Sequence, residues 1–386
     1  MHSTFNKFSA LRILRFLRQN KESVRRLPRT NLQAPNPAPA HRWTAEAINL
    51  ESLAPAVPFS DDNPLDVAVN NAANRLRIKS VHNTVYAQGL PEQSFVTVRD
   101  GICISSPELL FVETAPLMST AAHVLLGYEL CGTYGRDFSD PRNGDAIFNI
   151  PAVTDVQSIR SFINLCHNVR GTTKALDDLK YVANNAWSPV EAIIAAVLRL
   201  PIWEYGYAFG NVTLNKRVDP STYGSAGFAA QYRVPDIVID GSPVGINYDG
   251  DEHIDVDSVV QAALQLGKDP EDQESQSALQ EAIREARAKI LDDKRRDREL
   301  GSRGLYVLAV TKEDLYNIGQ FEGIVHLILD GMKSHGGFDV SQQRSYLNNN
   351  ALKQKRQDLV WSLLPGRRSI AIAHRLEEER LARLCL

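Results

Sequence analysis

The segment from Val234 to Tyr248 constrains the fold more than any other part of the chain. An apolar, β-branched run from Val234 to Ile239 is followed by Asp240-Gly241-Ser242-Pro243 and then by a second apolar run from Val244 to Tyr248. Two such runs joined by turn-forming residues predict an antiparallel β-hairpin. We therefore expect an α/β protein in which this hairpin belongs to a sheet.

The hairpin predicts a cluster of polar side chains at its open end. If Ile239 and Val244 flank the turn, Asp236 lies opposite Asn247, and side-chain alternation puts Asp249 on the same face. Carboxylates held this close repel one another unless a cation neutralises them, and hard divalent cations prefer oxygen ligands. The pattern predicts a site for Mg²⁺ or Mn²⁺. The acidic and imidazole groups just past the strand are Asp251, Glu252 and His253.

A second series of residues follows at regular spacing and carries a family resemblance. Together the two series are similar to the PD-(D/E)XK nuclease superfamily. Within it they resemble the Vsr-like (very-short-patch-repair-related) family of unknown function, whose pattern runs PD, then E-Y-D-G-x-x-H, then D-x-x-R-x-x-x-L-x-x-x-G. The resemblance covers roughly residues 188–317. The matching residues are Pro235, Asp236, Tyr248, Asp249, Gly250, His253, Asp293, Arg296, Leu300, Gly304 and Thr311.

The resemblance implies a restriction-endonuclease-like αβββαβ core and metal-assisted phosphodiester hydrolysis. It implies Asp236, Asp249 and Glu191 as metal ligands and His253 as a base or ligand. Asn247 stands in the family's acidic position, where an amide can ligate Mg²⁺ but brings no charge. Basic side chains on the following helix could hold phosphates: Lys294, Arg295, Arg296 and Arg298.

The helix expected from Ser188 onward has a second interpretation. Ser188 at the N-cap and Glu191 three residues later form a capping-box pattern, which would occupy Glu191 in the helix terminus and not at a metal. Leu200-Pro201 should end this helix, and strands are expected at 205–209 and 212–214.

The segment after His253 is expected to be a long helix at 271–300, whose apolar stripe includes Leu279 and Ile283 and whose charges mostly form a solvated face. A continuous apolar strand, Leu305 to Val310, should follow. Thr311 with Asp314 is a helix cap. This order of elements, found from periodicity and caps, agrees with an αβββαβ core.

The N-terminal part predicts a basic amphipathic helix from Phe5 to Leu17 and then a Pro- and Ala-rich linker from Ala34 to Pro58. Residues 1–29 carry eight Lys or Arg and one Glu. A helix packed in the protein with arginine stems on its rim is the preferred interpretation; DNA contact and a transit peptide are the alternatives.

A mixed α/β region is expected between Leu65 and Ala115. A helix is predicted at Val67–Arg77, a strand at Phe95–Val98 leading into a hairpin that ends at Ile104, and a helix capped by Ser106. This region resembles the segment after the winged helix of AbiEi-type antitoxins, which implies DNA binding and repression. The residues that carry this likeness are His82, Leu90, Pro91, Phe95, Gly101, Ile102, Ser106, Pro107, Glu108 and Leu109.

Four segments are predicted: a basic helix and linker (1–60), the N-terminal α/β region (61–180), the nuclease-like domain (181–335) and a helical, basic C-terminal tail (336–386) that Pro365-Gly366 breaks in two.

Tyr128 and Tyr134 are expected to pack in a core in preference to stacking on bases. The four cysteines, at 103, 131, 166 and 385, are widely spaced and read as free thiols of a cytoplasmic protein. No apolar run approaches a membrane span in length.

Three functions are consistent with the sequence. The first is a metal-dependent endonuclease acting on DNA or RNA. The second is a catalytically inactive nucleic-acid-binding or antitoxin-like regulator, with DNA the expected partner. The third is a protein-interaction scaffold built on the long charged helix and the tail.

Overall fold

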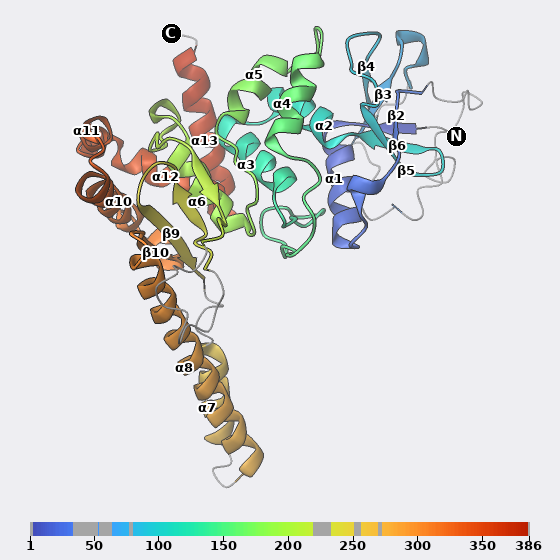
Figure 1. Ribbon diagram of the computed structural model, residues 1–386. Helices are drawn as coiled ribbons and strands as arrows, with labels where there is room; N and C mark the ends of the chain where they lie inside the picture. The colour runs from blue at the N-terminus through green and yellow to red at the C-terminus, as the bar shows by residue number, and fades with distance from the viewer. Residues whose placement is uncertain are drawn as a thin grey trace. The chain divides into compact units, whose positions relative to one another are not determined.

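The computed structural model describes residues 3–33, 53, 64–76, 80–218, 233–250, 256–268 and 272–384 (Figure 1). The chain divides into two compact units: Met1–Asn211 with Asp358–Leu386, and Val212–Gln357. Each unit has its own mixed sheet, so the predicted α/β class is confirmed. The four predicted sequence segments stay a prediction.

The sheet of the first unit has six strands in the order β2-β5-β6-β1-β3-β4. Strand β1 is parallel to β6 and antiparallel to β3, and β3 is parallel to β4. The predicted hairpin formed by β5 and β6 is confirmed, with Gly101 in the left-handed region at φ 72°. The strands are Ser3–Phe5 (β1), Arg29–Thr30 (β2), Leu65–Val69 (β3), Val81–Val85 (β4), Phe95–Arg99 (β5) and Ile102–Ser105 (β6).

The helix predicted at Val67–Arg77 is wrong. Leu65–Val69 is strand β3, and all five of its residues are buried. Val67 pairs with Phe5 of β1 on one side, and β3 pairs with β4 on the other. The β-branched Val67 and Val69 fit a strand that is covered on both faces, and this tertiary pairing outweighs the helix-forming residues that follow.

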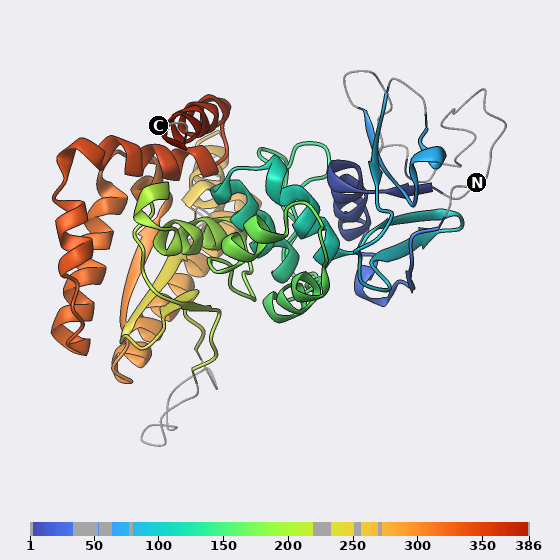
Figure 2. The same cartoon turned by 90° about the horizontal axis from the view of Figure 1, so that it is seen from above.

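Helices form much of the rest of the first unit, and Lys7–Gln19 (α1) lies beside the N-terminal sheet (Figure 2). Every residue of α2 is buried, and the Ser106 side chain accepts a hydrogen bond from the Leu109 N–H, so the predicted cap is confirmed. Tyr128 and Tyr134 are fully buried, as expected for core residues. The helices are Lys7–Gln19 (α1), Pro107–Thr114 (α2), Thr120–Cys131 (α3), Val156–Leu165 (α4), Thr172–Leu179 (α5), Pro189–Arg199 (α6) and Arg367–Leu384 (α13).

A buried ion pair joins α1 to α3. Arg15 donates from Nε and Nη2 to the two carboxylate oxygens of Glu129, at 2.9 and 2.7 Å, and Glu129 is 1% exposed. Arg18 donates to the carbonyl oxygens of Glu129 and Gly132. The predicted basic helix is therefore a packed helix, but Arg15 and Arg18 lie in the interior and not on its rim.

The second unit contains a four-stranded sheet in the order β10-β9-β8-β7. Strands β7, β8 and β9 are successively antiparallel, and β10 is parallel to β9. The predicted capping box of Thr311 and Asp314 is confirmed at the start of α9. The elements are Val212–Leu214 (β7), Ile237–Ile239 (β8), Val244–Asp249 (β9), Tyr306–Thr311 (β10), Lys312–Tyr316 (α9), Gln320–Gly336 (α10) and Ser341–Leu347 (α11).

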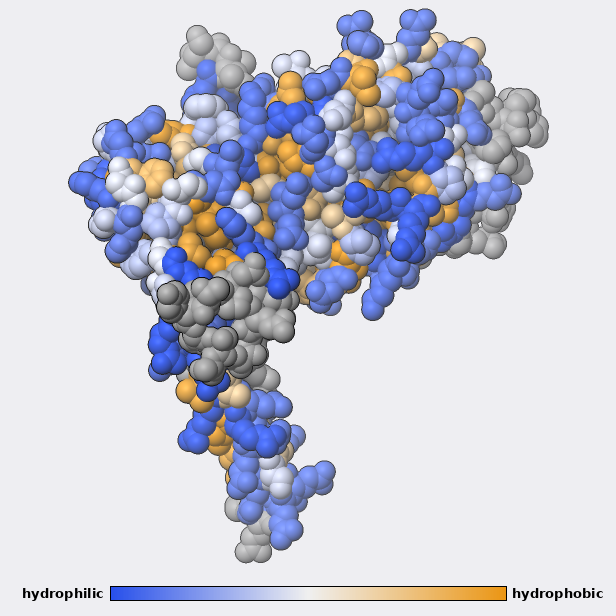
Figure 3. All heavy atoms as spheres, viewed as in Figure 1, coloured by the Kyte–Doolittle hydropathy of each residue, from blue (hydrophilic) through white to orange (hydrophobic). Residues whose placement is uncertain are grey.

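Two helices connect β9 to β10. Helix α7, Val256–Leu266, packs against α8, Gln273–Gly301, and in Figure 1 this pair extends away from the sheet of its own unit. The surface of this arm is mainly hydrophilic with a few hydrophobic side chains (Figure 3). Leu264 and Leu291 of these helices are 59% and 55% exposed. The predicted helix at 271–300 is confirmed as α8, whereas α7 was not predicted.

The strand predicted at 205–209 is also wrong. Residues Ile202–Glu204 form a 3-10 helix, and Tyr205 and Ala208 have φ of 63° and 52°, which interrupts an extended strand.

The C-terminal helices are confirmed: Lys353–Leu363 (α12) crosses from the second unit into the first, and Pro365-Gly366 separates it from α13. Cys103, Cys131 and Cys166 are free thiols, and Cys385 lies outside the described residues. In the described part of the chain, no helix has the length and apolar character that crossing a membrane requires.

Glu129→Gln should lower the free energy of unfolding by about 3–5 kcal/mol at pH 7, because it leaves Arg15 charged and buried without its partner. Burial alone would raise the pKa of Glu129, but Arg15 outweighs this and lowers the pKa to about 2. A depressed carboxylate pKa stabilises the fold above its unfolded value and loses that effect as pH falls. Urea unfolding should therefore show a loss of stability in the wild type between about pH 4.5 and pH 2 that is reduced in Glu129→Gln.

The matched control is the double variant Arg15→Met, Glu129→Leu, which removes both charges. It should recover most of the stability lost by Glu129→Gln at pH 7. If the single and the double variants lose the same amount, the ion pair is not the reason for the loss.

Candidate functional site

The predicted hairpin and its register are present in the second unit. Ile237 pairs with Ile246 and Val238 with Gly245. Gly241 takes φ +77° in the turn, where residues with a Cβ are strained. Continuing this register places Asp236 opposite Asn247, as predicted. Asp236, Asn247 and Asp249 thus lie on one face at the open end of the hairpin.

Two hydrogen bonds of Asp236, one to Asn247 and one from Tyr248, close this open end. The backbone N–H of Asp236 donates to Asn247 Oδ1 at 3.2 Å, and the backbone N–H of Tyr248 donates to Asp236 Oδ2 at 2.6 Å. Asn247 is 2% exposed. A buried amide needs such a partner, because an unpaired buried polar group costs free energy. We call this arrangement the Asp236–Asn247 clasp.

Asp249 lies at the end of β9, opposite Thr311 of β10, and faces a guanidinium of α8. Arg296 Nη2 is 3.6 Å from Asp249 Oδ1, and the two side chains are 19% and 33% exposed. The negative charge of Asp249 is therefore partly balanced within the protein.

The other three predicted phosphate-binding residues are on the surface of the same helix. Lys294, Arg295 and Arg298 are exposed, and Arg298 Nε donates to the Lys294 carbonyl oxygen, 3.2 Å away within α8. The last turns of α8 thus combine one arginine directed to the sheet with three exposed cations.

A second arginine, which the sequence reasoning missed, anchors the hairpin to α8. Arg233 precedes β8 and is 8% exposed. Its Nε donates to Glu299 Oε2 at 2.6 Å and its two terminal nitrogens donate to Asp292, at 3.2 and 3.0 Å. The hydrogen bond from Arg233 lowers the pKa of Asp292. The sequence contains only part of the signal for this contact: Asp292 and Glu299 are two helical turns apart and therefore share a face of α8.

Glu191 belongs to the first unit, and its contacts agree with the capping interpretation. The Glu191 N–H donates to Ser188 Oγ at 3.1 Å, which confirms the N-cap. Glu191 Oε2 accepts from the Trp187 N–H at 3.0 Å, one residue before the position that a capping box uses. Its assignment as a metal ligand stays a prediction.

The remaining predicted site residues, Asp251, Glu252 and His253, lie outside the described residues. Within the described ranges, no group of three or more His, Cys, Asp or Glu side chains is arranged to hold a metal ion. The described part of the site therefore offers two carboxylates, Asp236 and Asp249, and the Asn247 amide.

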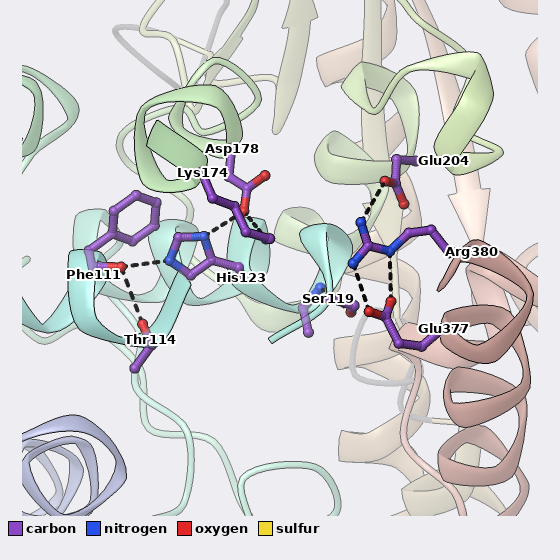
Figure 4. Close-up of polar contacts among 10 residues, drawn as sticks. Phe111, Thr114, Ser119, His123, Lys174, Asp178, Glu204, Glu377 and Arg380 are labelled. Atoms are coloured by element: carbon purple, nitrogen blue, oxygen red, sulfur yellow. Dashed lines mark hydrogen bonds and ion pairs between the residues drawn. The ribbon is translucent and has the colours of Figure 1, made fainter. Parts of the chain in front are cut away.

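Two polar clusters of the first unit involve groups that can also take part in catalysis (Figure 4). His123 is fully buried, with Nδ1 2.8 Å from Asp178 and Nε2 2.8 Å from the Phe111 carbonyl oxygen, and Lys174 also contacts Asp178. Both ring nitrogens have partners, and the ring stacks on Phe111. This burial is typical of a structural histidine.

The second cluster holds the C-terminal helix. Arg380 of α13 donates to both oxygens of Glu377 and lies 4.0 Å from Glu204 (Figure 4). Burial raises the pKa of Glu204, and the positive charge of Arg380 opposes this shift. The cluster links α13 to the 3-10 helix at Ile202–Glu204.

Comparison of the chain with protein-family models, with curated proteins and with solved structures finds no match.

Asp236→Ala should destabilise the second unit by about 1–3 kcal/mol, because the Tyr248 N–H loses its acceptor. Asp236→Asn should cost less, since its amide oxygen can accept the same hydrogen bond. Hydrogen exchange at the Tyr248 amide is the direct measurement: it should accelerate in Asp236→Ala more than in Asp236→Asn. Equal exchange in the wild type and in Asp236→Ala would contradict the clasp.

Proposed function

We propose that this chain is a nuclease-like protein that acts on the phosphodiester backbone of nucleic acid, with Mg²⁺ or Mn²⁺, at the open end of the β8–β9 hairpin. The proposal rests on one observation: Asp236, Asn247 and Asp249 lie at one end of the hairpin, and Asp249 contacts Arg296 in the basic last turns of α8. The strand order supports it too: an antiparallel β7-β8-β9 meander, a helical connection, and β10 parallel to β9. This order agrees with the βββαβ part expected of a restriction-endonuclease-like core.

The donor set fits a hard divalent cation. Mg²⁺ in proteins is commonly held by one or two carboxylates and retains several waters, and Asp236 and Asp249 supply two carboxylates. The cation, when bound, would polarise a phosphate and lower the pKa of a bound water. Lys294, Arg295 and Arg298 would hold the backbone phosphates through charge-assisted hydrogen bonds. Glu191 and His253 stay candidate participants.

A second function, nucleic-acid binding without cleavage, is favoured by one contact. Arg296 lies 3.6 Å from Asp249 and partly cancels its charge, while Asn247 is neutral. These three residues therefore bring less negative charge than three carboxylates would, and a site of low negative charge binds a divalent cation weakly. Such a protein would act as a DNA-binding regulator, as the resemblance of residues 82–109 to AbiEi-type antitoxins also implies.

Cleavage of labelled single- and double-stranded DNA and RNA in Mg²⁺ and Mn²⁺ tests the first function. The wild type should cut, and Asp236→Asn, which can keep the hydrogen bond to Tyr248, should cut about 10–100-fold more slowly because a metal ligand loses its charge. Asn247→Asp should cut faster than the wild type by restoring a carboxylate. Cutting by Asn247→Asp alone would favour the binding function, and no cutting by any folded variant would contradict the nuclease.

Salt dependence tests the contact with phosphates independently of cleavage. In EDTA, the logarithm of the DNA association constant should fall with the logarithm of salt concentration, by about 0.9 for each phosphate contact. The triple variant Lys294→Gln, Arg295→Gln, Arg298→Gln should lower this slope by about 2–3. Arg284→Gln with Arg287→Gln, on the arm part of the same helix, is the matched control and should leave the slope unchanged. Equal slopes in all three proteins would show that the end of α8 does not contact phosphates.

A further inference from the structure

A pocket of about 290 Å³ lies in the first unit between α1, α3 and the segment from Arg136 to Arg142. One part of its wall is apolar and includes Phe8, Leu125 and Phe138. The volume is just below the usual range of small-molecule sites, about 300–1,000 Å³. The pocket can therefore hold a small organic molecule but not a folded partner.

The rest of the wall is strongly basic. Four arginines line the pocket, at 12, 15, 136 and 142, with Glu129 as the one acidic residue among the lining side chains. Glu129 is already bound through both oxygens to Arg15. Four guanidinium groups against one carboxylate leave the lining with an excess of positive charge.

Of the lining arginines, Arg136 and Arg142 have no ion pair within 4.0 Å with a carboxylate of the described residues. Arg136 Nη1 donates to the Pro141 carbonyl oxygen at 3.1 Å, the Tyr134 hydroxyl interacts with the guanidinium, and Nη2 has no acceptor within hydrogen-bond distance. Neutral oxygens satisfy a guanidinium only in part, because a carboxylate or phosphate makes stronger, charge-assisted hydrogen bonds.

Arg142 is held rigidly at the same pocket. Its Nη1 donates to the Ser362 carbonyl oxygen at 2.7 Å and to Ser369 Oγ at 2.8 Å. Burial lowers the pKa of Arg142, and the positive charge of Arg136 beside it lowers the pKa further. Two like charges are therefore fixed near each other, and an anion between them would remove their repulsion.

We propose that this pocket binds an amphipathic organic anion, with a phosphate or carboxylate head between Arg136 and Arg142 and an apolar body against Phe8, Leu125 and Phe138. The planar guanidinium matches both head groups through paired hydrogen bonds. The site belongs to the first unit and uses none of the residues of the hairpin end, so it is independent of the proposed function.

Calorimetric titration with phenyl phosphate and with benzoate tests the proposal, and benzyl alcohol serves as the neutral probe. At least one anion should bind the wild type, and benzyl alcohol should bind at least tenfold more weakly. Arg136→Met should weaken anion binding at least tenfold. Arg25→Met, at a 63% exposed arginine that does not line the pocket, should leave it unchanged. The two anions separate a phosphate-selective from a carboxylate-selective pocket, and either result supports the site.

Absence of binding of both anions to the folded wild type would overturn the proposal, as would equal affinity in the wild type and Arg136→Met. Phe138→Ala, on the apolar wall, gives a second test if Arg136→Met does not fold: it should weaken phenyl phosphate but not inorganic phosphate. Asp236→Asn should bind the anions like the wild type, so failure of the nuclease proposal leaves this result unaffected.

Discussion

Folding of the first unit depends on the buried ion pair between Arg15 and Glu129. Removing two charges from water costs several kcal/mol per ion, and the cost is offset only when geometry and extra hydrogen bonds are favourable. Here both carboxylate oxygens accept from Arg15, and one of them also accepts from the Arg136 N–H at 3.2 Å. Helix α1, helix α3 and the segment at Arg136 must therefore be in place together.

The same use of arginine recurs in the second unit. Arg233 connects the start of β8 to Glu299 and Asp292 of α8, and Arg356, which is fully buried, binds Glu322 and three carbonyl oxygens. These arginines are thus structural. A basic run in the sequence is a poor guide to a phosphate-binding surface unless burial is known, as α1 demonstrates.

Local patterns predicted the hairpin well because a short turn fixes the register, and the caps at Ser106, Ser188 and Thr311 each depend on residues within one helical turn. The strand β3 was mistaken for a helix because its identity depends on its neighbours β1 and β4. The ion pairs could not be predicted from the sequence for the same reason: Arg15 and Glu129 are 114 residues apart, and Arg233 and Glu299 are 66 residues apart. Of the candidate site, the facing of Asp236 and Asn247 was predictable, but the contact of Arg296 with Asp249 was not.

The parallel pairing of β9 with β10 has a consequence for the order of folding. Strands β7, β8 and β9 pair in antiparallel fashion, with a tight turn between β8 and β9, whereas β10 reaches its place only after the whole α7–α8 arm has been accommodated. Closing a long loop costs chain entropy before its contacts form. The hairpin can therefore form early from local contacts, and β10 is added late. Until then β9 has an unpaired edge, which is the surface through which a folding intermediate of this unit would associate with another chain.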